Sequence, residues 1–529
     1  MVSKKLQVWL PLMFSVVMII GMYLGFTLRG NTAGAGVFLR NNGNSTVEEV
    51  LNLVRTKYVD DVKTDSLGDL AIDNILSHLD PHTVYIPPKD LAYVNEDLEG
   101  KFQGIGVEFQ VFYDTVNIVN VIPGGPSEKA GVEVGDKLIK VNDTVNMAGV
   151  HITSDGIRKN LRGPQNSTVA ITVLRGNALK KIVIERGMIP LPSIDAAYLI
   201  APQTGYIRIN KFAATTYLEF MDAITRLQKQ GMDKLVLDLR DNGGGLVDQA
   251  YDIADEFLDG DKMVVYTQGN KSPRYNYTCK KDGVFEKGKL VVLVNESTAS
   301  ASEILSGALQ DWDRATIIGR RTFGKGLVQN QFNLSNGGAL RLTIARYYTP
   351  LGRNIQKPYD KGREQYEDEL MNRFHDGEVL HGDTAKHLGP SYKTPGGHIV
   401  YGGGGITPDV FVAFDTTTQS KALSQMFTKG TLSDYVYNYY IQHKGELQQI
   451  KNPEALYNQF KPGETDWQQL VNFAKKDSVD IANVPPAVKA DLLQRLPTLL
   501  ARQVWRTEGY FEVNNQSDSV VKKALEVLK

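Results

Sequence analysis

The chain has 529 residues, of which 42% are hydrophobic and 22% charged; this is too long for one ordinary domain and predicts roughly two to four. Fifty-nine basic residues against 60 acidic residues give a net charge of -1, so there is no broad positive field to hold a nucleic acid. The single cysteine, Cys279, excludes an internal disulfide framework and a cysteine-based zinc cluster.

The N-terminal region predicts a membrane anchor over residues 1–30. Two lysines precede an uncharged run from Leu6 to Leu28, and at about 1.5 Å per residue this run can cross a hydrocarbon core of about 30 Å. The alternative is a cleaved signal peptide, for which small residues at 32–35 offer a cleavage site. Basic residues before the span favour a cytoplasmic N-terminus. We therefore expect a single-pass inner-membrane protein whose bulk lies on the extracytoplasmic, periplasmic side.

Two further segments precede the largest domain. Residues 31–95 are expected to form a short helical segment, because apolar residues recur at helical spacing from Ser45 until Asp80-Pro81 interrupts them. From about 96 to 188 the sequence changes to short β-type runs separated by turns rich in Gly, Pro and Asn. This texture predicts a compact β-rich domain.

Residues 189–410 alternate near-continuous apolar strands with amphipathic helices. This pattern indicates an α/β domain whose parallel sheet is covered on both faces. Residues 411–529 are polar and rich in Gln and Lys. They are expected to form a helical C-terminal extension, to which the sequence assigns no role.

The β-rich domain carries a peptide-binding signature. Glycines at 104 and 106 stand directly before a strand, where bare backbone can approach a ligand closely. The segment 121–142, with its Ala-Gly and Gly-Asp pairs, resembles the PDZ family. The resemblance implies that Gly104, Ile105, Gly106 and Val107 line a groove for the C-terminus of an extended polypeptide.

A candidate nucleophile stands at the junction of a strand and a helix. The apolar run from Leu290 leads through a small-residue bend to a helix with an apolar face. A serine at such a bend projects from the sheet, and the free amides of the helix N-terminus can hold an oxyanion. The alternative is purely structural, because Ser300 and Glu303 also have the spacing of a capping box.

A candidate base follows 25 positions later. Lys325 lies between two glycines at the start of an apolar strand, where its side chain could turn inward and lose its proton more easily. A neutral lysine can accept the proton of a serine hydroxyl, which is the Ser-Lys variant of the catalytic triad. Gln329 is expected on the same strand face as Lys325 and could hold its amine. The alternative for Lys325 is a surface lysine in a flexible turn.

Together these motifs resemble the carboxyl-terminal processing, or tail-specific, serine protease family from about 47 to 409. The resemblance rests on motifs that begin at Leu79 (Leu-Asp-Pro-His-Thr), Leu237 (Leu-Asp-Leu-Arg-Asp-Asn-Gly-Gly-Gly), Ser297 (Ser-Thr-Ala-Ser-Ala-Ser-Glu), Gly324 (Gly-Lys-Gly), Thr349 (Thr-Pro-Leu-Gly-Arg-Asn-Ile-Gln) and Ile406 (Ile-Thr-Pro-Asp). It implies a ClpP/crotonase-like core with an inserted PDZ domain, and a membrane-anchored endopeptidase that cleaves proteins near their C-termini.

The same resemblance assigns the roles of single residues. Ser300 is the nucleophile, Lys325 the base and Gln329 the residue that orients the lysine. The amides of Gly244 and Ala301 form the oxyanion hole, although the usual Asn-Pro-Gly-Gly turn here has glycine in place of proline. The PDZ domain either delivers the substrate or acts as a lid, and the sequence leaves both open.

Rival interpretations are weaker. The phosphate-loop pattern that ends at Lys325 lacks the Ser or Thr needed for magnesium. His78 and His82 have a zinc-like spacing, but a proline breaks the helix they would need. Four histidines within one polar insertion are interpreted as a solvated loop. No metal, nucleotide or other cofactor is expected. Partners are protein or peptide substrates with free C-termini, the membrane, and a homo-oligomer or adaptor. The remaining alternative is an inactive PDZ-bearing membrane scaffold.

Overall fold

The computed structural model describes residues 46–112, 114–149, 151–382, 389–417 and 420–529, with Ser15, Val17, Met18 and Gly21. The predicted anchor therefore lies almost wholly outside the described residues. Within the described ranges, no helix is both long and apolar enough to cross a membrane. The chain divides into two units, residues 1–75 and 76–529.

The first unit contains helices, as the apolar periodicity predicts. They are α2 (Thr46–Lys57) and most of α3 (Thr64–Ser77), and a short polar segment separates them. All described strands belong to the second unit.

A six-stranded sheet forms the centre of the second unit. Its order is β10 (Ile194–Ala201), β11 (Thr204–Ile209), β12 (Lys234–Asp238), β15 (Lys289–Val294), β16 (Thr316–Gly319) and β21 (Val410–Phe411). All neighbours from β11 onwards are parallel, and only β10 is antiparallel to its neighbour. The predicted parallel α/β domain is thus confirmed.

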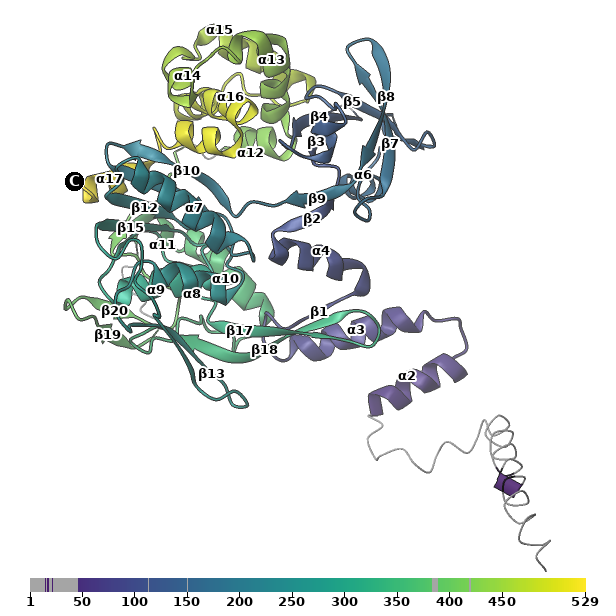
Figure 1. Cartoon of the computed structure of the whole chain (residues 1–529), viewed down its shortest axis with the longest axis vertical. Helices are drawn as coiled ribbons and strands as arrows, with labels where there is room; N and C mark the ends of the chain where they lie inside the picture. The colour runs from purple at the N-terminus through teal and green to yellow at the C-terminus, as the bar shows by residue number, and fades with distance from the viewer. Residues whose placement is uncertain are drawn as a thin grey trace, which may run out of the picture. The chain divides into compact units, whose positions relative to one another are not determined.

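The two faces of this sheet are covered by helices from distant parts of the chain. Alternate residues of a strand point to opposite faces, so Leu237 and Val292 pack with α7 (Thr216–Lys229), α8 (Val247–Asp255) and α9 (Ala301–Asp311). Val236, Val291 and Leu293 face the other way, toward α17 (Ser519–Val527). Figure 1 shows α17, at the C-terminal end, beside this sheet. The last helix of the chain therefore completes the central core, a role that the sequence did not reveal.

A second, antiparallel sheet lies in the same unit. It joins β1 (Val84–Ile86), β13 (Met263–Gln268), β14 (Tyr275–Thr278), β17 (Leu327–Asn333) and β18 (Ala339–Tyr348). Strand β1 pairs with β18, which also pairs with β17, the strand that follows Lys325. The Asp80-Pro-His-Thr segment therefore lies against β18, where Thr343 bonds to Asp80 and Thr83.

The β-rich domain has its own apolar core. Its sheet contains β3 (Val107–Phe112), β4 (Thr115–Val121), β5 (Lys137–Val141), β6 (Val145–Asn146), β7 (Thr168–Arg175) and β8 (Ala178–Glu185), with helices α5 (Pro126–Lys129) and α6 (Ser154–Leu161). The pair β2 (Lys101–Gly104) and β9 (Gly187–Pro190) forms a stem at the domain boundary, preceded by α4 (Pro88–Glu99). Strand β3 is an edge strand.

The polar insertion after β18 contains defined structure, contrary to the expected solvated loop. It forms α10 (Arg363–His375), α11 (Glu378–His381), β19 (Ser391–Lys393) and β20 (Ile399–Tyr401). Tyr366 and Arg373 of α10 are buried. The helix forms because these side chains bond to partners in the core. Those partners lie in other segments of the chain, so the sequence of the insertion alone does not predict the helix. Of its four histidines, His387 lies outside the described residues.

The C-terminal extension is a helical domain with its own apolar core. Its helices are α12 (Lys421–Thr428), α13 (Thr431–Leu447), α14 (Pro453–Gln459), α15 (Glu464–Lys476) and α16 (Pro486–Asn514). Helix α13 packs against β3 through Phe112 and Tyr437, whose ring centroids are 4.9 Å apart. Gln110 Nε2 of β3 also donates to Asp434 Oδ1 of α13 at 3.4 Å.

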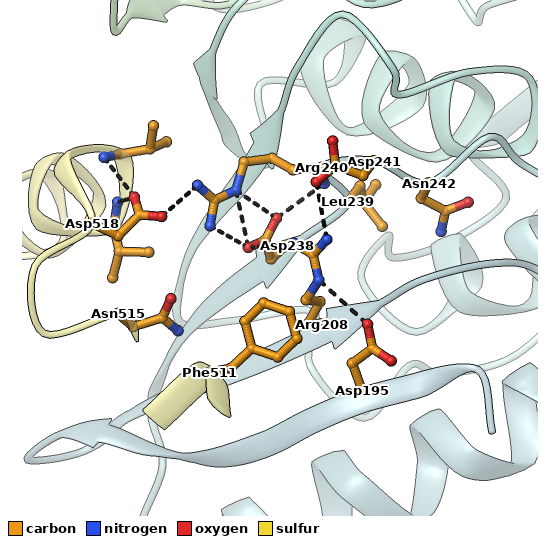
Figure 2. Close-up of polar contacts among 12 residues, drawn as sticks. Asp195, Arg208, Asp238, Leu239, Arg240, Asp241, Asn242, Phe511, Asn515 and Asp518 are labelled. Carbon is orange, nitrogen blue, oxygen red and sulfur yellow. Dashed lines mark hydrogen bonds and ion pairs between the residues drawn. The ribbon is translucent and has the colours of Figure 1, made fainter. Parts of the chain in front are cut away.

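A buried ionic cluster connects the end of the extension to the central sheet. Figure 2 shows Arg240 between Asp238 and Asp518, with Nη2 to Asp238 Oδ2 at 2.6 Å and Nη1 to Asp518 Oδ2 at 2.8 Å. Arg208 adds a third ion pair, to Asp238 at 3.2 Å. Burial raises the pKa of Asp238, but Arg240 and Arg208 outweigh burial and lower it well below its usual range. Since Asp518 also caps α17, the cluster fixes the loop after β12 to the last helix.

Candidate active site

Ser300 occupies a sharp turn between β15 and α9. Its backbone has φ 57° and ψ -116°, a region that costs of order 1–3 kcal/mol for a residue other than glycine and is found where surrounding structure enforces it. Such a strained strand-to-helix turn is the geometry that presents a nucleophilic serine in other hydrolases. The side chain is half-buried and accepts no capping hydrogen bond.

Glu303 explains why the turn persists. Its Oε2 accepts the amide of Ser300 at 2.8 Å and the amide of Lys325 at 2.8 Å. Its Oε1 accepts the amide of Gly324 at 2.8 Å and the hydroxyl of Thr322 at 2.5 Å. Burial raises the pKa of Glu303, and these four donors oppose the rise. The capping interaction predicted from sequence thus uses the main chain of Ser300, and the same carboxylate joins the serine turn to the lysine loop.

The Lys325 side chain lies in a partly desolvated setting. Burial lowers its pKa, Arg341 lowers it further, and Glu303 and Asp80 act in the opposite direction. Lys325 is half-buried, which favours an inward-turned side chain over a surface lysine. The Tyr347 hydroxyl lies within hydrogen-bonding distance of the Lys325 carbonyl and 3.1 Å from the Ser300 carbonyl. In the described part of the chain, no hydrogen bond links Lys325 Nζ to Ser300 Oγ.

The structure places Gln329 differently from the prediction. Lys325 precedes β17, and a register shift lies between Val328 and Gln329. The alternation along a regular strand therefore does not relate the two residues. Gln329 Nε2 donates to the carbonyl of His82. Its role in orienting the lysine stays a prediction.

Gly244 and Ala301 lie beside the serine, but only one of their amides is free. A Cβ on Gly244, at φ 98°, would lie 2.8 Å from Ser300 Cβ and 3.0 Å from the Ala301 nitrogen. The Gly244 amide already donates to Asn242 Oδ1 at 2.9 Å. Among the residues that the structure describes, the Ala301 amide has no partner. The oxyanion hole formed by these two amides stays a prediction.

The peptide-binding prediction falls on a small apolar hollow between β3 and α6. A cavity of about 90 Å³ is lined by Ile105, Gly106 and Val107 together with Phe102, Phe109, Arg158, Leu161 and Arg162. Gly104 does not line it; Gly104 pairs with Gly187 in the β2–β9 stem. The two arginines were not predicted, because nothing in their spacing marks them as ligand-binding.

Comparisons with known proteins agree with these features. A peptidase family S41 model matches residues 203–362, and a PDZ domain model matches residues 103–185. A carboxyl-terminal-processing protease of Picosynechococcus is 34% identical over 334 residues, which are 59% of this chain and 77% of that protein. The chain belongs to peptidase family S41.

Other similarities have a narrower extent. A probable CtpA-like serine protease of Staphylococcus aureus is 36% identical over 312 residues, which are 58% of this S41 chain and only 62% of that protein. The photosystem II D1 C-terminal processing protease is 28% identical, covering 70% of this chain and 86% of that structure with a TM-score of 0.36, too low to support a conclusion about the fold. Residues 422–506 match a family of unknown function (DUF8443).

One wall of this S41 site comes from a segment whose role the sequence did not reveal. Asp80 Oδ1 accepts the amides of His82 and Thr83 at 2.9 and 3.0 Å. His82 Nε2 lies 2.7 Å from the Tyr366 hydroxyl. Burial and the neighbouring Lys325 lower the pKa of His82 to about 4. The Asp-Pro-His-Thr motif was the available signal, but motif spacing alone gave it no place in the site.

Replacing Glu303 with glutamine should disturb both halves of this S41 site together. The amide nitrogen of glutamine would face backbone N–H donors, so we expect a loss of about 2–4 kcal/mol in the free energy of unfolding. Urea denaturation measures it. The exposed Asp282 supplies the control, and Asp282→Asn should stay within about 0.5 kcal/mol. Equal stability of both variants would contradict the assigned role of Glu303.

Proposed function

We propose that the chain is a serine endopeptidase that cleaves proteins near their C-termini, with Ser300 as nucleophile and Lys325 as general base. The observation that carries the proposal is the Glu303 carboxylate, which bonds the amides of both residues at 2.8 Å. Membership of peptidase family S41 supports the reaction class. The lowered pKa of Lys325 supports a neutral amine as the base.

The proposed reaction begins with acylation. Neutral Nζ of Lys325 accepts the Oγ proton while Oγ of Ser300 bonds to the peptide carbonyl carbon. The Ala301 amide holds the resulting oxyanion, and the Gly244 amide joins it after leaving Asn242 Oδ1. The lysine ammonium then returns the proton to the leaving amine as the C–N bond breaks. Hydrolysis of the acyl-enzyme repeats these proton transfers with water as the nucleophile.

Removing either reacting group should abolish turnover. On an unfolded protein with a free apolar C-terminus, Ser300→Ala and Lys325→Ala should each lower kcat at least about 1,000-fold. The matched control is Ser297→Ala, an exposed serine of the same loop, which should cleave like the unaltered protein. Equal and negligible cleavage by all four proteins would instead support the inactive scaffold.

The pH profile of the same proteins separates a lysine base from other catalysts. Cleavage should rise with pH along a limb whose apparent pKa lies below the ordinary lysine value, because only the neutral amine can accept the proton. Arg341 lowers the pKa of Lys325, so Arg341→Met should move this limb to higher pH. Arg346 lies exposed on the same strand, and Arg346→Met should leave it in place. An unmoved limb in Arg341→Met would argue against Lys325 as the base.

We further propose that the PDZ domain captures the substrate's C-terminus along β3. Val107 and Phe109 of this strand line the hollow with Arg158 of α6 and Arg162 at the C-cap of that helix. This lining suits an apolar peptide that ends in a carboxylate, which would share Arg158 with Asp155 and Arg162 with Glu96. Gln110 and Phe112 contact the helical extension. Strand β3 would therefore contact both the bound peptide and the helical extension. This contact supports a gating role in addition to delivery.

Removing the PDZ domain tests whether it delivers the substrate to the protease or covers the active site as a lid. Gly104 and Gly187 are paired neighbours in the stem, so residues 105–186 can be replaced by an Asn-Gly turn that closes β2 and β9 into a hairpin. We expect kcat/KM for a substrate with a free apolar C-terminus to fall about 100-fold, with cleavage of short internal peptides unchanged. The matched control is the same substrate with an amidated C-terminus on the intact protein. Increased basal cleavage after deletion would indicate a lid, and an unchanged kcat/KM for the substrate with a free C-terminus would contradict delivery.

We also propose that the run from Leu6 to Leu28 tethers the protein to the inner membrane with the protease on the periplasmic side. The proposal rests on the length of the run and the lysines before it. In alkaline extraction the full chain should stay with the membrane pellet, and a chain starting at Thr46 should be released. Release of both, with a shortened N-terminus in the full chain, would identify a cleaved signal peptide instead.

A further inference from the structure

The helix α10 in the polar insertion buries charged side chains behind the loop that carries Lys325. Arg373 is 3% exposed. Its Nη1 donates to the carbonyls of Arg321 at 3.0 Å and Thr322 at 2.8 Å, and its Nη2 donates to the carbonyl of Phe323 at 3.1 Å. These are three consecutive carbonyls, and they end two residues before Lys325.

The planar guanidinium is suited to this task. Its donors point outward in a fixed fork, whereas a lysine ammonium is a single point of charge on a flexible stem. The remaining donors of Arg373 bond to Glu369, with Nε to Oε1 at 2.8 Å and Nη2 to Oε2 at 3.0 Å. The buried cation is therefore paired, as a group removed from water requires.

Glu369 fixes α10 to the core from the same side. It also accepts from Lys357 Nζ at 2.9 Å and pairs with Arg321 at 3.2 Å. Lys357 is fully buried and lies on the segment whose amide donates to the Gly324 carbonyl at 2.9 Å. Burial raises the pKa of Glu369, but Arg373 and Lys357 outweigh it and lower the pKa to about 2. Glu369 therefore stays ionised throughout the neutral range.

Two buried side chains of opposite charge thus hold the lysine loop, a cation at its carbonyl groups and an anion at its amide groups. Arg373 binds the carbonyls of 321–323, and Glu303 binds the amides of Gly324 and Lys325. If the hydrogen bonds of Arg373 or those of Glu303 are lost, the peptide groups of the loop are free to rotate. The side chain of Lys325 would then reach solvent, where its amine regains a higher pKa.

We infer that Arg373 is a positioning residue for the general base: the α10 insertion holds the Lys325 loop in its reactive arrangement without touching the substrate. The inference rests on the proposed roles of Ser300 and Lys325. It gives the polar insertion a structural role in catalysis. This role requires no contact between the insertion and the substrate, and no ligand site on the insertion. The effect should appear in kcat and in the pH profile, because a displaced base binds substrate as before but removes the proton less well.

The test compares Arg373→Met, Arg373→Lys and the control Arg363→Met in the full chain. Arg363 lies on the same helix, 47% exposed in its side chain, and pairs only with Glu367 among the described residues. On a short peptide substrate, Arg373→Met should lower kcat about 10- to 100-fold with KM within about twofold, and the limb along which its cleavage rises with pH should move to higher pH. Arg373→Lys should recover part of kcat, because it retains the charge beside Glu369. Arg363→Met should match the unaltered protein.

A second readout does not depend on cleavage. In a Ser300→Ala background, the rate at which Lys325 is acetylated by a soluble reagent, followed by mass spectrometry across pH, reports the pKa of its amine. Adding Arg373→Met should raise that pKa, and adding Arg363→Met should not. An unchanged Lys325 pKa in folded Arg373→Met or Arg373→Lys protein would overturn the inference. If the unaltered protein cleaves nothing but Arg373→Met still raises the pKa of Lys325, the proposed endopeptidase function fails and the positioning role of Arg373 stands.

Discussion

The arrangement of the candidate site depends on one buried carboxylate. Glu303 is 0% exposed, and an anion removed from water is tolerated only where donors replace its hydration. Three backbone amides and one hydroxyl do so. Because these donors belong to two segments far apart in the chain, satisfying the carboxylate brings the segments together. The strained backbone of Ser300 is held by the same carboxylate, so one side chain fixes both the serine turn and the main chain of Lys325.

Buried ionic clusters hold the other loops that surround the serine. Arg373 and Glu369 fix the carbonyl side of the lysine loop, and Arg240 joins Asp238 to Asp518 beside the glycine loop. Removing one partner from a buried pair typically costs about 3–5 kcal/mol, because the other charge is left without compensation. Such clusters add little net stability but restrict each loop to one arrangement. A reaction that requires an amine, a hydroxyl and backbone amides within hydrogen-bonding distance gains from that restriction.

The helical extension links the peptide-binding domain to the central sheet. Helix α13 contacts β3, and α16 reaches β10, where Glu508 accepts the Ala197 amide at 3.0 Å. Between these contacts α16 contains a kink in which Arg506 adopts φ 63° and ψ -153°, a conformation that costs about 1–3 kcal/mol outside glycine. Arg506 points to the PDZ domain, with Nη2 at 3.5 Å from the Val121 carbonyl. The helical extension therefore contacts both other domains, the PDZ domain through α13 and Arg506 and the central sheet through Glu508.

The sequence by itself determined the elements and the chemistry. Apolar alternation identified the parallel strands, the Ala-Gly and Gly-Asp pairs identified the PDZ domain, and a serine at a strand-to-helix bend followed by Gly-Lys-Gly identified the candidate site. These signals are local, since strand period, turn glycines and helix starts are written in neighbouring residues. Tertiary structure alone decided which side chains hold the site. The hydrogen bonds of Arg373 to the lysine loop, the contact of His82 with Tyr366 and the packing of α17 on the sheet all join residues distant in the chain. Which residues meet in these contacts is decided by packing and by the need to pair buried charges. Neither requirement produces a pattern among neighbouring residues of the sequence.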